Sequence, residues 1–271
     1  MSIYNETIKV TVNTLKQMKQ NGQKIAMVTC YDYSSAKILD STSIDAVLVG
    51  DSAANVMAGY ETTLPITLDE MIIYAASVVR GCKRAMVVVD MPFGTYQGDA
   101  REASKNAVEI MKRTGAQAVK IEGGKEIEES YKAILATGIP IMAHLGLTPQ
   151  SINKFGGYGL RAKEDAEAEI LLQNALLAEK LGCFSVVLEK IPTQLAEKVT
   201  QSLQIPTIGI GAGNVCDGQV LVFQDVLGIN EGFKPKFLRK YSNIAEQIRT
   251  AINNYSKDVK SGDFPNAQEQ Y

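Results

Sequence analysis

The hydrophobic residues of this chain form short continuous runs, separated by longer segments in which apolar residues recur with helical spacing. Runs of four or five apolar residues without alternation are typical of strands buried on both faces, as in a parallel sheet. The predicted strands span residues 25–29, 46–49, 85–89, 118–121, 139–143, 184–188, 206–210 and 220–223. Eight strands in a chain of 271 residues predict a (β/α)8 TIM barrel.

The segments between these runs carry signals for helix starts and ends. Thr67 and Glu70 fit a capping box, and Asp99 fits an N-cap. The predicted helices include 127–136, 164–181, 193–203 and 241–252, and a helix over 8–18 is expected to cap one end of the barrel. Four helices are predicted to stop at a glycine in the left-handed conformation: Gly81, Gly115, Gly138 and Gly182.

Two regions interrupt this rhythm. Residues 146–159 form a long glycine-bearing loop after the fifth strand, and a lid over the site is its functional interpretation. Residues 253–271 are polar, and we expect a frayed or partner-docked tail there. Nothing marks an internal domain boundary, so we predict a single barrel domain over residues 1–271 with a polar tail from about 254 to 271.

Composition excludes several classes of function. With 45% hydrophobic and 21% charged residues, the chain is an ordinary globular sequence, and its net charge of -2 argues against nucleic-acid binding. No apolar run approaches the ~18 residues that span a bilayer, and the N-terminus lacks a signal-peptide core, so we expect a cytoplasmic protein. The cysteines are widely spaced without a CxxC pair, which predicts neither disulfides nor a zinc site.

Charged residues recur at the carboxyl ends of the predicted strands. They are Asp51, Asp90, Lys120, Glu122, His144 and Glu189. Any one of these residues alone is equally consistent with an ordinary charged side chain that is exposed to solvent. Together they indicate an active site built from several parallel strands.

Asp51 and Asp90 follow successive strands and suit Mg²⁺, which usually takes one or two protein carboxylates and keeps several waters. Glu122 is a further candidate ligand, either directly or through water. Lys120 lies two residues before Glu122, so both side chains share one face. Lys120 is therefore either a group that binds a substrate carboxylate or a simple partner of Glu122. We expect both side chains to lie at the mouth of the barrel, because burying this charged pair against a helix would be costly in free energy.

The remaining candidates keep two interpretations each. Glu189 suits a general base at the edge of an apolar interior, or a surface salt bridge with Lys190. His144, the single histidine, is more commonly a core residue than a catalyst, although its strand end favours the site. The glycines of 209–213 follow the seventh strand, where barrels often bind phosphate, or they permit a tight turn or the close approach of a flat ligand.

A series of motifs extends from about residue 24 to 228. They are Met27-Val28-Thr29-Cys30-Tyr31-Asp32, Val49-Gly50-Asp51-Ser52, Asp90-Met91-Pro92-Phe93-Gly94, Val119-Lys120-Ile121-Glu122-Gly123-Gly124, His144-Leu145-Gly146-Leu147-Thr148-Pro149-Gln150, and Ile208-Gly209-Ile210-Gly211-Ala212-Gly213 with Cys216-Asp217-Gly218-Gln219. In this order they resemble the ketopantoate (3-methyl-2-oxobutanoate) hydroxymethyltransferase family.

The resemblance implies a (β/α)8 barrel enzyme that moves a hydroxymethyl group from 5,10-methylenetetrahydrofolate to 3-methyl-2-oxobutanoate. The product would be 2-dehydropantoate, in the first step of pantothenate synthesis, formed through a Mg²⁺-stabilised enolate. It further implies Asp51, Asp90 and Glu122 at the Mg²⁺, Asp51, Ser52, Asp90 and Lys120 at the keto acid, and Glu189 as the proton acceptor. The family also implies a homo-oligomer, often a decamer.

The chain departs from the family pattern at Gly159-Leu160-Arg161-Ala162 and at Tyr74-Ala75-Ala76, which bears on loop conformation and folate contacts rather than on the reaction. Two alternatives remain. Other Mg²⁺-dependent barrels that act on 2-oxo acids, such as the isocitrate lyase and phosphoenolpyruvate mutase group, would be expected to carry a cysteine-bearing loop, which is not found here. A non-catalytic barrel that binds a metabolite would not need a base such as Glu189.

Overall fold

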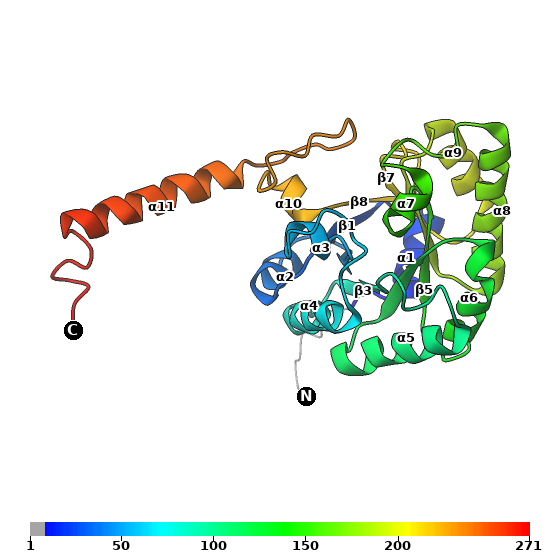
Figure 1. The fold of residues 1–271 in the computed structure, drawn as a ribbon, viewed down its shortest axis with the longest axis horizontal. Helices are drawn as coiled ribbons and strands as arrows, with labels where there is room; N and C mark the ends of the chain where they lie inside the picture. Colours follow the sequence, from blue (N-terminus) through cyan, green and yellow to red (C-terminus); the bar gives the residue numbers. More distant parts are fainter. Residues whose placement is uncertain (1–8) are drawn as a thin grey trace. The chain divides into compact units, whose positions relative to one another are not determined.

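Eight parallel strands close into a barrel in the computed structural model, which describes residues 9–271 (Figure 1). Each strand pairs with its neighbours in the sequence, and β1 pairs with β8 to complete the sheet. The strands are β1 (Ile25–Thr29), β2 (Ala46–Val49), β3 (Met86–Asp90), β4 (Ala118–Glu122), β5 (Ile141–Gly146), β6 (Ser185–Glu189), β7 (Thr207–Ile210) and β8 (Gly218–Leu221). The predicted (β/α)8 barrel is confirmed.

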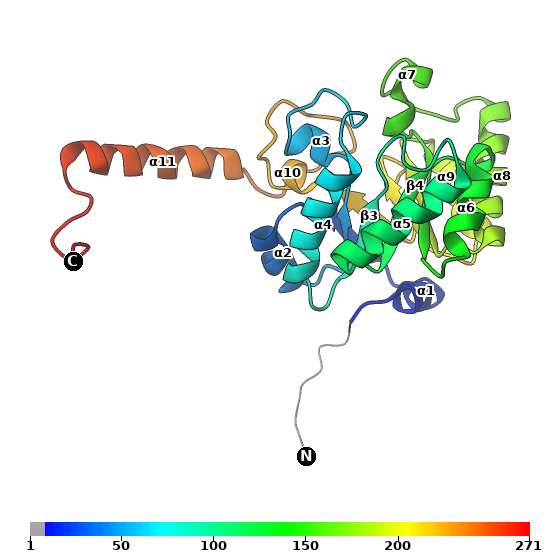
Figure 2. The same ribbon diagram turned by 60° about the horizontal axis from the view of Figure 1, so that its bottom comes forward.

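Helices in the connections between the strands surround the barrel (Figure 2). The helices of the described residues are α1 (Val12–Gln20), α2 (Tyr33–Asp40), α3 (Ala53–Val56), α4 (Leu68–Gly81), α5 (Ala100–Thr114), α6 (Glu128–Leu135), α7 (Ile152–Phe155), α8 (Asp165–Leu181), α9 (Thr193–Ser202), α10 (Phe223–Val226) and α11 (Ile244–Ser261), with the short 3-10 helices η1 (Lys125–Ile127) and η2 (Pro149–Ser151). No helix among residues 9–271 has the length and apolar character needed to cross a membrane.

Strand alternation separates two hydrophobic regions. Along β4, Ala118 belongs to the cluster inside the barrel, whereas Val119 and Ile121 belong to the cluster between the sheet and the surrounding helices. Because successive side chains point to opposite faces, Lys120 and Glu122 share the interior face with Ala118. The barrel interior is thus apolar at one end and charged at the other.

The apolar end is closed by α1, which lies at the opposite end of the barrel from α7 (Figure 2). Leu15 of α1 is fully buried and joins the interior cluster. Lys19 then fastens the helix, because its ammonium group lies 2.8 Å from the Asp217 carboxylate and donates to the Thr200 carbonyl at 2.9 Å. The predicted capping helix is confirmed over 12–20; residue 8, where its predicted span began, lies outside the described residues.

Most predicted helix ends are present. The Thr67–Glu70 capping box is formed, and α5 and α8 end at Gly115 and Gly182, both with positive φ. The expectation for Gly81 is wrong, because it is the last residue of α4 and its φ is not positive. A side chain there would lie 2.6 Å from Ala36 Cβ, so this glycine permits close packing of α2 against α4.

Several element boundaries also differ from the expectation, and strand β5 spans 141–146 instead of 139–143. Strand β8 occupies 218–221 instead of 220–223, because its pairing with β1 begins at Gly218, opposite Ile25. An added Cβ at Gly218 would lie 2.5 Å from the Ile25 carbonyl oxygen, so β8 needs a glycine at this position. A search for hydrophobic runs does not detect a strand that begins with glycine. The loop 146–159 is not wholly irregular, since it contains η2 and α7.

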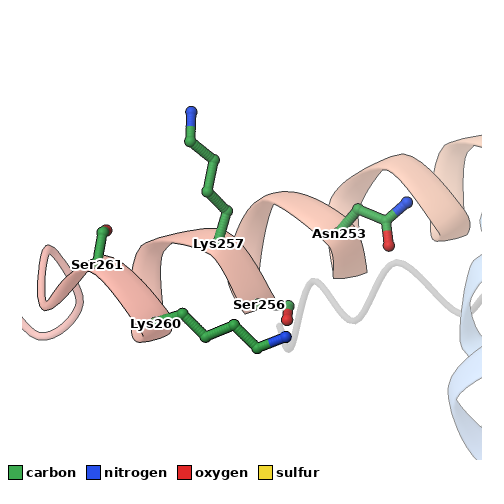
Figure 3. Close-up of a pocket in the computed structure, with 5 residues that line it drawn as sticks. All are labelled: Asn253, Ser256, Lys257, Lys260 and Ser261. Carbon is green, nitrogen blue, oxygen red and sulfur yellow. The ribbon is translucent and has the colours of Figure 1, made fainter.

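Residues from Phe223 onward form a second compact unit. Helix α11 continues to Ser261, so the expected fraying is wrong over 253–261. Figure 3 shows polar side chains of α11 that line an open pocket: Asn253, Ser256, Lys257, Lys260 and Ser261. The single domain over 1–271 stays a prediction.

Asp40, the last residue of α2, ties that helix to the start of β3. Its carboxylate accepts hydrogen bonds from the backbone N–H groups of Lys83 (2.7 Å), Arg84 (3.0 Å) and Ala85 (2.8 Å). Partial burial raises its pKa, but these donors and the Arg84 charge outweigh that effect and hold the pKa below its usual range. The contribution of Asp40 to stability is therefore present above the unfolded-state pKa and is lost as pH falls through the folded-state pKa.

We expect Asp40→Asn to lower the free energy of unfolding at pH 7 by about 1.5–3 kcal/mol, the range for hydrogen bonds to charged groups. The difference from wild type should shrink at pH 3, where the carboxylate is being protonated in both states. Urea denaturation at the two pH values measures this. Asp69→Asn is the control, because Asp69 is exposed and pairs only with exposed Arg113. Equal effects of both substitutions at pH 7 would contradict the assignment.

Candidate active site

The charged residues that the sequence placed at strand ends meet inside one mouth of the barrel. Strand register sets Asp90 opposite Lys120 and Glu122 opposite His144. Asp51 follows β2, and its backbone N–H donates to Asp90 Oδ2 at 3.0 Å. The charged residues that the sequence singled out at strand ends are therefore brought together, and their function as an active site stays a prediction.

Asp51 and Asp90 are almost fully buried, at 4% and 2% exposure. Gly50 precedes Asp51 at a close approach, because an added Cβ would lie 2.7 Å from Ser52 Oγ and 3.6 Å from Asp90 Oδ2. A side chain at position 50 would crowd the Ser52 hydroxyl and make van der Waals contact with Asp90. The Gly-Asp-Ser sequence thus brings a carboxylate and a hydroxyl next to the acid of the neighbouring strand.

Lys120 is the buried cation of this cluster. Its ammonium group lies 3.0 Å from Asp90 Oδ1 and 3.6 Å from Glu122 Oε1. Burial lowers the pKa of Lys120, but the surrounding carboxylates outweigh burial and raise it, so the side chain stays charged. The simple Lys120–Glu122 pair is therefore an incomplete description, since Asp90 is the closer partner.

Three carboxylates surround this one ammonium group. Burial raises the pKa values of Asp51, Asp90 and Glu122, and repulsion between the acids raises those of Asp51 and Asp90 further. Lys120 opposes this effect without cancelling it. Glu122 Oε1 and Asp90 Oδ1 are buried without an aligned hydrogen bond, although each lies within ion-pair distance of Lys120. The site therefore has room for further positive charge.

A small hard cation fits this donor set. Carboxylate oxygens are the ligands that Mg²⁺ takes, and one or two of them suffice because the ion keeps several waters. Among residues 9–271, no group of three or more His, Cys, Asp or Glu side chains is arranged to hold a metal ion. Metal ligation by Asp51, Asp90 and Glu122 therefore stays a prediction.

His144 is buried and neutral. Burial and the Lys120 charge lower the pKa of its imidazole to about 4. Nδ1 lies 3.1 Å from Lys120 Nζ, and an ammonium group can only donate, so Nδ1 accepts and the ring hydrogen resides on Nε2. That nitrogen is 3.3 Å from Glu189 Oε2. His144 therefore belongs to the site as well as to the core.

Glu189 ends β6 and is the most exposed acid of the cluster, with 15% of its side chain accessible. The alternative pairing with Lys190 is not formed, because Lys190 donates to the Tyr158 carbonyl. Lys190 also has a φ of 45°, a left-handed conformation that is uncommon outside glycine. Glu189 is thus left next to His144 at the mouth, where a substrate can reach it.

Ser52 precedes α3 and makes no capping hydrogen bond with its side chain. Its hydroxyl instead contacts the Tyr31 hydroxyl at 2.8 Å. Tyr31 is a site-lining residue that hydrophobic periodicity does not single out.

Gln150 and Tyr96 were not predicted as site residues. Gln150 lies in η2 and contacts both Asp51 and Glu122, while Tyr96 contacts Gln150 and the Glu122 backbone. Gln150 could have been found from its place beside Pro149 in the motif after β5. It was missed because the sequence of a polar loop does not show that one of its residues is buried. For the glycines of 209–213, the tight-turn interpretation has support, because Gly211 and Gly213 have positive φ values of 66° and 82°, while the close approach of a flat ligand stays a prediction. Phosphate binding there stays a prediction.

Removing the Lys120 charge should destabilise the fold. We expect Lys120→Met to lower the free energy of unfolding by about 3–5 kcal/mol, because it leaves buried carboxylates without their cation. Urea denaturation at pH 7 measures the change. Lys132→Met is the matched control, since Lys132 pairs with Glu128 and Glu129 at the surface and such pairs contribute at most about 1 kcal/mol. A Lys120→Met protein as stable as the control variant would refute this electrostatic description.

Comparison with known proteins gives a consistent set of similarities. A family model described as ketopantoate hydroxymethyltransferase matches residues 9–267. The 3-methyl-2-oxobutanoate hydroxymethyltransferase of Flavobacterium johnsoniae is 62% identical over 263 residues, covering 97% of each chain. The enzyme of that name from Porphyromonas gingivalis is 60% identical over 273 residues, covering both chains completely.

Solved structures share the fold at low identity. Phosphonopyruvate hydrolase in complex with oxalate and Mg²⁺ has a TM-score of 0.61 at 10% identity, covering 96% of this chain and 93% of that chain. A 2,3-dimethylmalate lyase, described as a member of the PEP mutase/isocitrate lyase superfamily, has a TM-score of 0.59 at 16% identity, with 96% and 91% covered. These likenesses show the barrel fold alone.

Proposed function

The chain belongs to the ketopantoate hydroxymethyltransferase family and is an enzyme of that type, and on this premise we propose its donor, metal and residue roles. The one-carbon unit of 5,10-methylenetetrahydrofolate passes to 3-methyl-2-oxobutanoate, water supplies the hydroxyl oxygen, and 2-dehydropantoate and tetrahydrofolate are the products. One observation carries the proposal: a buried pair of carboxylates, Asp51 and Asp90, shares the barrel mouth with a separate accessible carboxylate, Glu189.

Asp51 and Asp90 would hold Mg²⁺, with Glu122 as a further acid directly or through water. The raised pKa values of these acids support the assignment, because they reflect negative charge that Lys120 alone does not balance. When bound, Mg²⁺ would supply positive charge to the substrate oxygen on which negative charge develops.

Lys120 and Ser52 would bind the keto acid. Lys120 keeps its charge while buried, so it can attract the substrate carboxylate in a region from which water is excluded. The Ser52 hydroxyl is held by Tyr31 rather than by the backbone of α3, which leaves it able to hydrogen-bond a substrate oxygen. Both groups then orient the substrate for proton removal.

Glu189 would accept the proton that leaves C3 of the keto acid, and that carbon then forms the bond to the one-carbon unit. His144 fits this role for Glu189, because its Nε2 lies 3.3 Å from Oε2 and the neutral imidazole adds no competing charge. His144 can therefore help to hold the Glu189 carboxylate in place.

We expect Glu189→Gln to lower kcat by about 10²–10⁴-fold, the usual contribution of a positioned general base. Formation of 2-dehydropantoate from the keto acid and methylenetetrahydrofolate is the measurement, with folding checked by circular dichroism. Glu197→Gln on the exposed side of α9 is the matched control and should keep wild-type activity.

Wild-type turnover should also stop with EDTA and return with Mg²⁺. Unchanged turnover in Glu189→Gln would refute the base assignment. A wild-type protein that binds the keto acid tightly without turnover would instead be a metabolite-binding barrel.

A homo-oligomer, with a decamer as the specific expectation, is also proposed. Its support is the apolar stripe of α11: Ile248, Ile252, Tyr255 and Val259 follow helical spacing, and each is exposed by 45% or more. Such a stripe is typical of a helix that packs against a partner surface. A cytoplasmic location is proposed too, supported by four cysteines that are all buried and free.

Charge on the stripe should weaken assembly. We expect Ile252→Asp to reduce the molecular mass in solution below that of wild type, as measured by light scattering after size exclusion. Lys257→Asp also introduces an acid on α11, but outside the stripe, and it should leave the mass unchanged. A wild-type protein that is monomeric at micromolar concentration would exclude the oligomer.

A further inference from the structure

Gln150 occupies an unusual position for a loop residue. It lies in η2, in the loop that follows β5, yet it is only 6% exposed. Its backbone N–H donates to Glu122 Oε2 at 2.9 Å, and its side-chain amide donates to Asp51 Oδ2 at 3.0 Å. One residue of this loop therefore contacts two of the acids at the site.

The amide of Gln150 has a complete set of partners. Besides Asp51, the Nε2 group donates to the Met91 carbonyl at 3.0 Å, while Oε1 accepts from Tyr96 Oη at 2.7 Å and Gln97 Nε2 at 2.8 Å. The orientation of the amide is forced, because a carbonyl and a carboxylate only accept hydrogen bonds and must face the NH2 group.

The partners of Gln150 are themselves fixed. Gln97 Oε1 accepts from the Gly94 N–H at 2.8 Å, so Gln97 must present its NH2 group to Gln150. Tyr96 accepts from the Glu122 N–H at 2.9 Å and directs its own hydrogen to Gln150. The hydrogen bonds therefore run in one direction, from Gly94 through Gln97 and Gln150 to Asp51.

We infer that Gln150 is a positioning residue for Asp51 and sets the direction in which this carboxylate presents itself to the metal; the inference rests on the proposed function. A hydrogen bond that fixes a ligating carboxylate pre-organises the site and affects metal affinity without contacting the ion. The loop after β5 then has a second role in addition to the lid predicted from its length. Its first turn positions the carboxylates of Asp51 and Glu122.

Gln150→Met tests this inference, because methionine keeps the length of the side chain and removes every hydrogen bond of the amide. We expect Mn²⁺ binding, followed by electron paramagnetic resonance on the full-length protein without substrate, to weaken about 10–100-fold. The Mg²⁺ concentration that gives half-maximal turnover should rise by the same factor. A loop that is merely loosened would lower thermal stability and leave both quantities unchanged.

Gln117→Met is the matched control. Gln117 also hydrogen-bonds a strand, because its Oε1 accepts from the Val87 N–H at 2.9 Å, but it lies before β4 and contacts none of the acids of the site. Its Mn²⁺ affinity should equal that of wild type.

If Gln150→Met does not fold, Gln97→Leu is the variant that tests the inference. It removes one of the two donors to Gln150 Oε1, so Mn²⁺ binding should weaken roughly 2- to 10-fold. Wild-type affinity in a folded Gln150→Met protein, or in Gln97→Leu where that variant is used, overturns the positioning role alone. A wild-type protein that fails to bind Mn²⁺ overturns the proposed metal site and this inference with it.

Discussion

Three buried carboxylates share one lysine at the carboxyl ends of β2, β3 and β4, and the mouth of the barrel is organised around this imbalance of charge. Acids taken out of water are costly unless they are paired or hydrogen-bonded. Lys120 supplies one charge, the Asp51 N–H supports Asp90, and the Gln150 N–H supports Glu122. The negative charge that these groups do not balance favours the binding of a further cation at the mouth of the barrel.

The two ends of the barrel interior differ in composition: one is a packed apolar core and the other carries charged side chains. At the amino end, α1 closes an apolar interior, and Lys19 fixes it through Asp217. At the carboxyl end, the interior positions of β4 carry Lys120 and Glu122 instead of aliphatic side chains. The same alternation of the strand thus produces a packed core in one half and a charged cluster in the other.

Loops complete what the strands begin. His144 on β5 lies between Lys120 and Glu189, so the lysine that balances the acids also sets the tautomer of the ring beside Glu189. The loop after β5 reaches back to Asp51 through Gln150, across residues 99 apart in the sequence. Electrostatics and positioning are therefore coupled, and no single strand holds the site alone.

Local pattern was sufficient for the barrel and for the charged residues at its strand ends. Continuous apolar runs located β1 and β2 to the residue, because strands buried on both faces leave an unmistakable pattern. The same pattern misplaced β8, which begins at Gly218 and needs a residue without a side chain beside Ile25. It also left Gly81 as a helix stop, although its role is to let α2 approach α4.

The sequence by itself determined the fold class and which acids, lysine and histidine stand at strand ends, because these features follow from periodicity and from the order of residues along each strand. Only the tertiary structure decided which of these groups touch. Lys120 lies closer to Asp90 on the neighbouring strand than to Glu122 on its own strand, and Gln150 is buried against Asp51. Such contacts depend on strand register and on the path of a loop, which are set by closure of the whole barrel and leave no local trace.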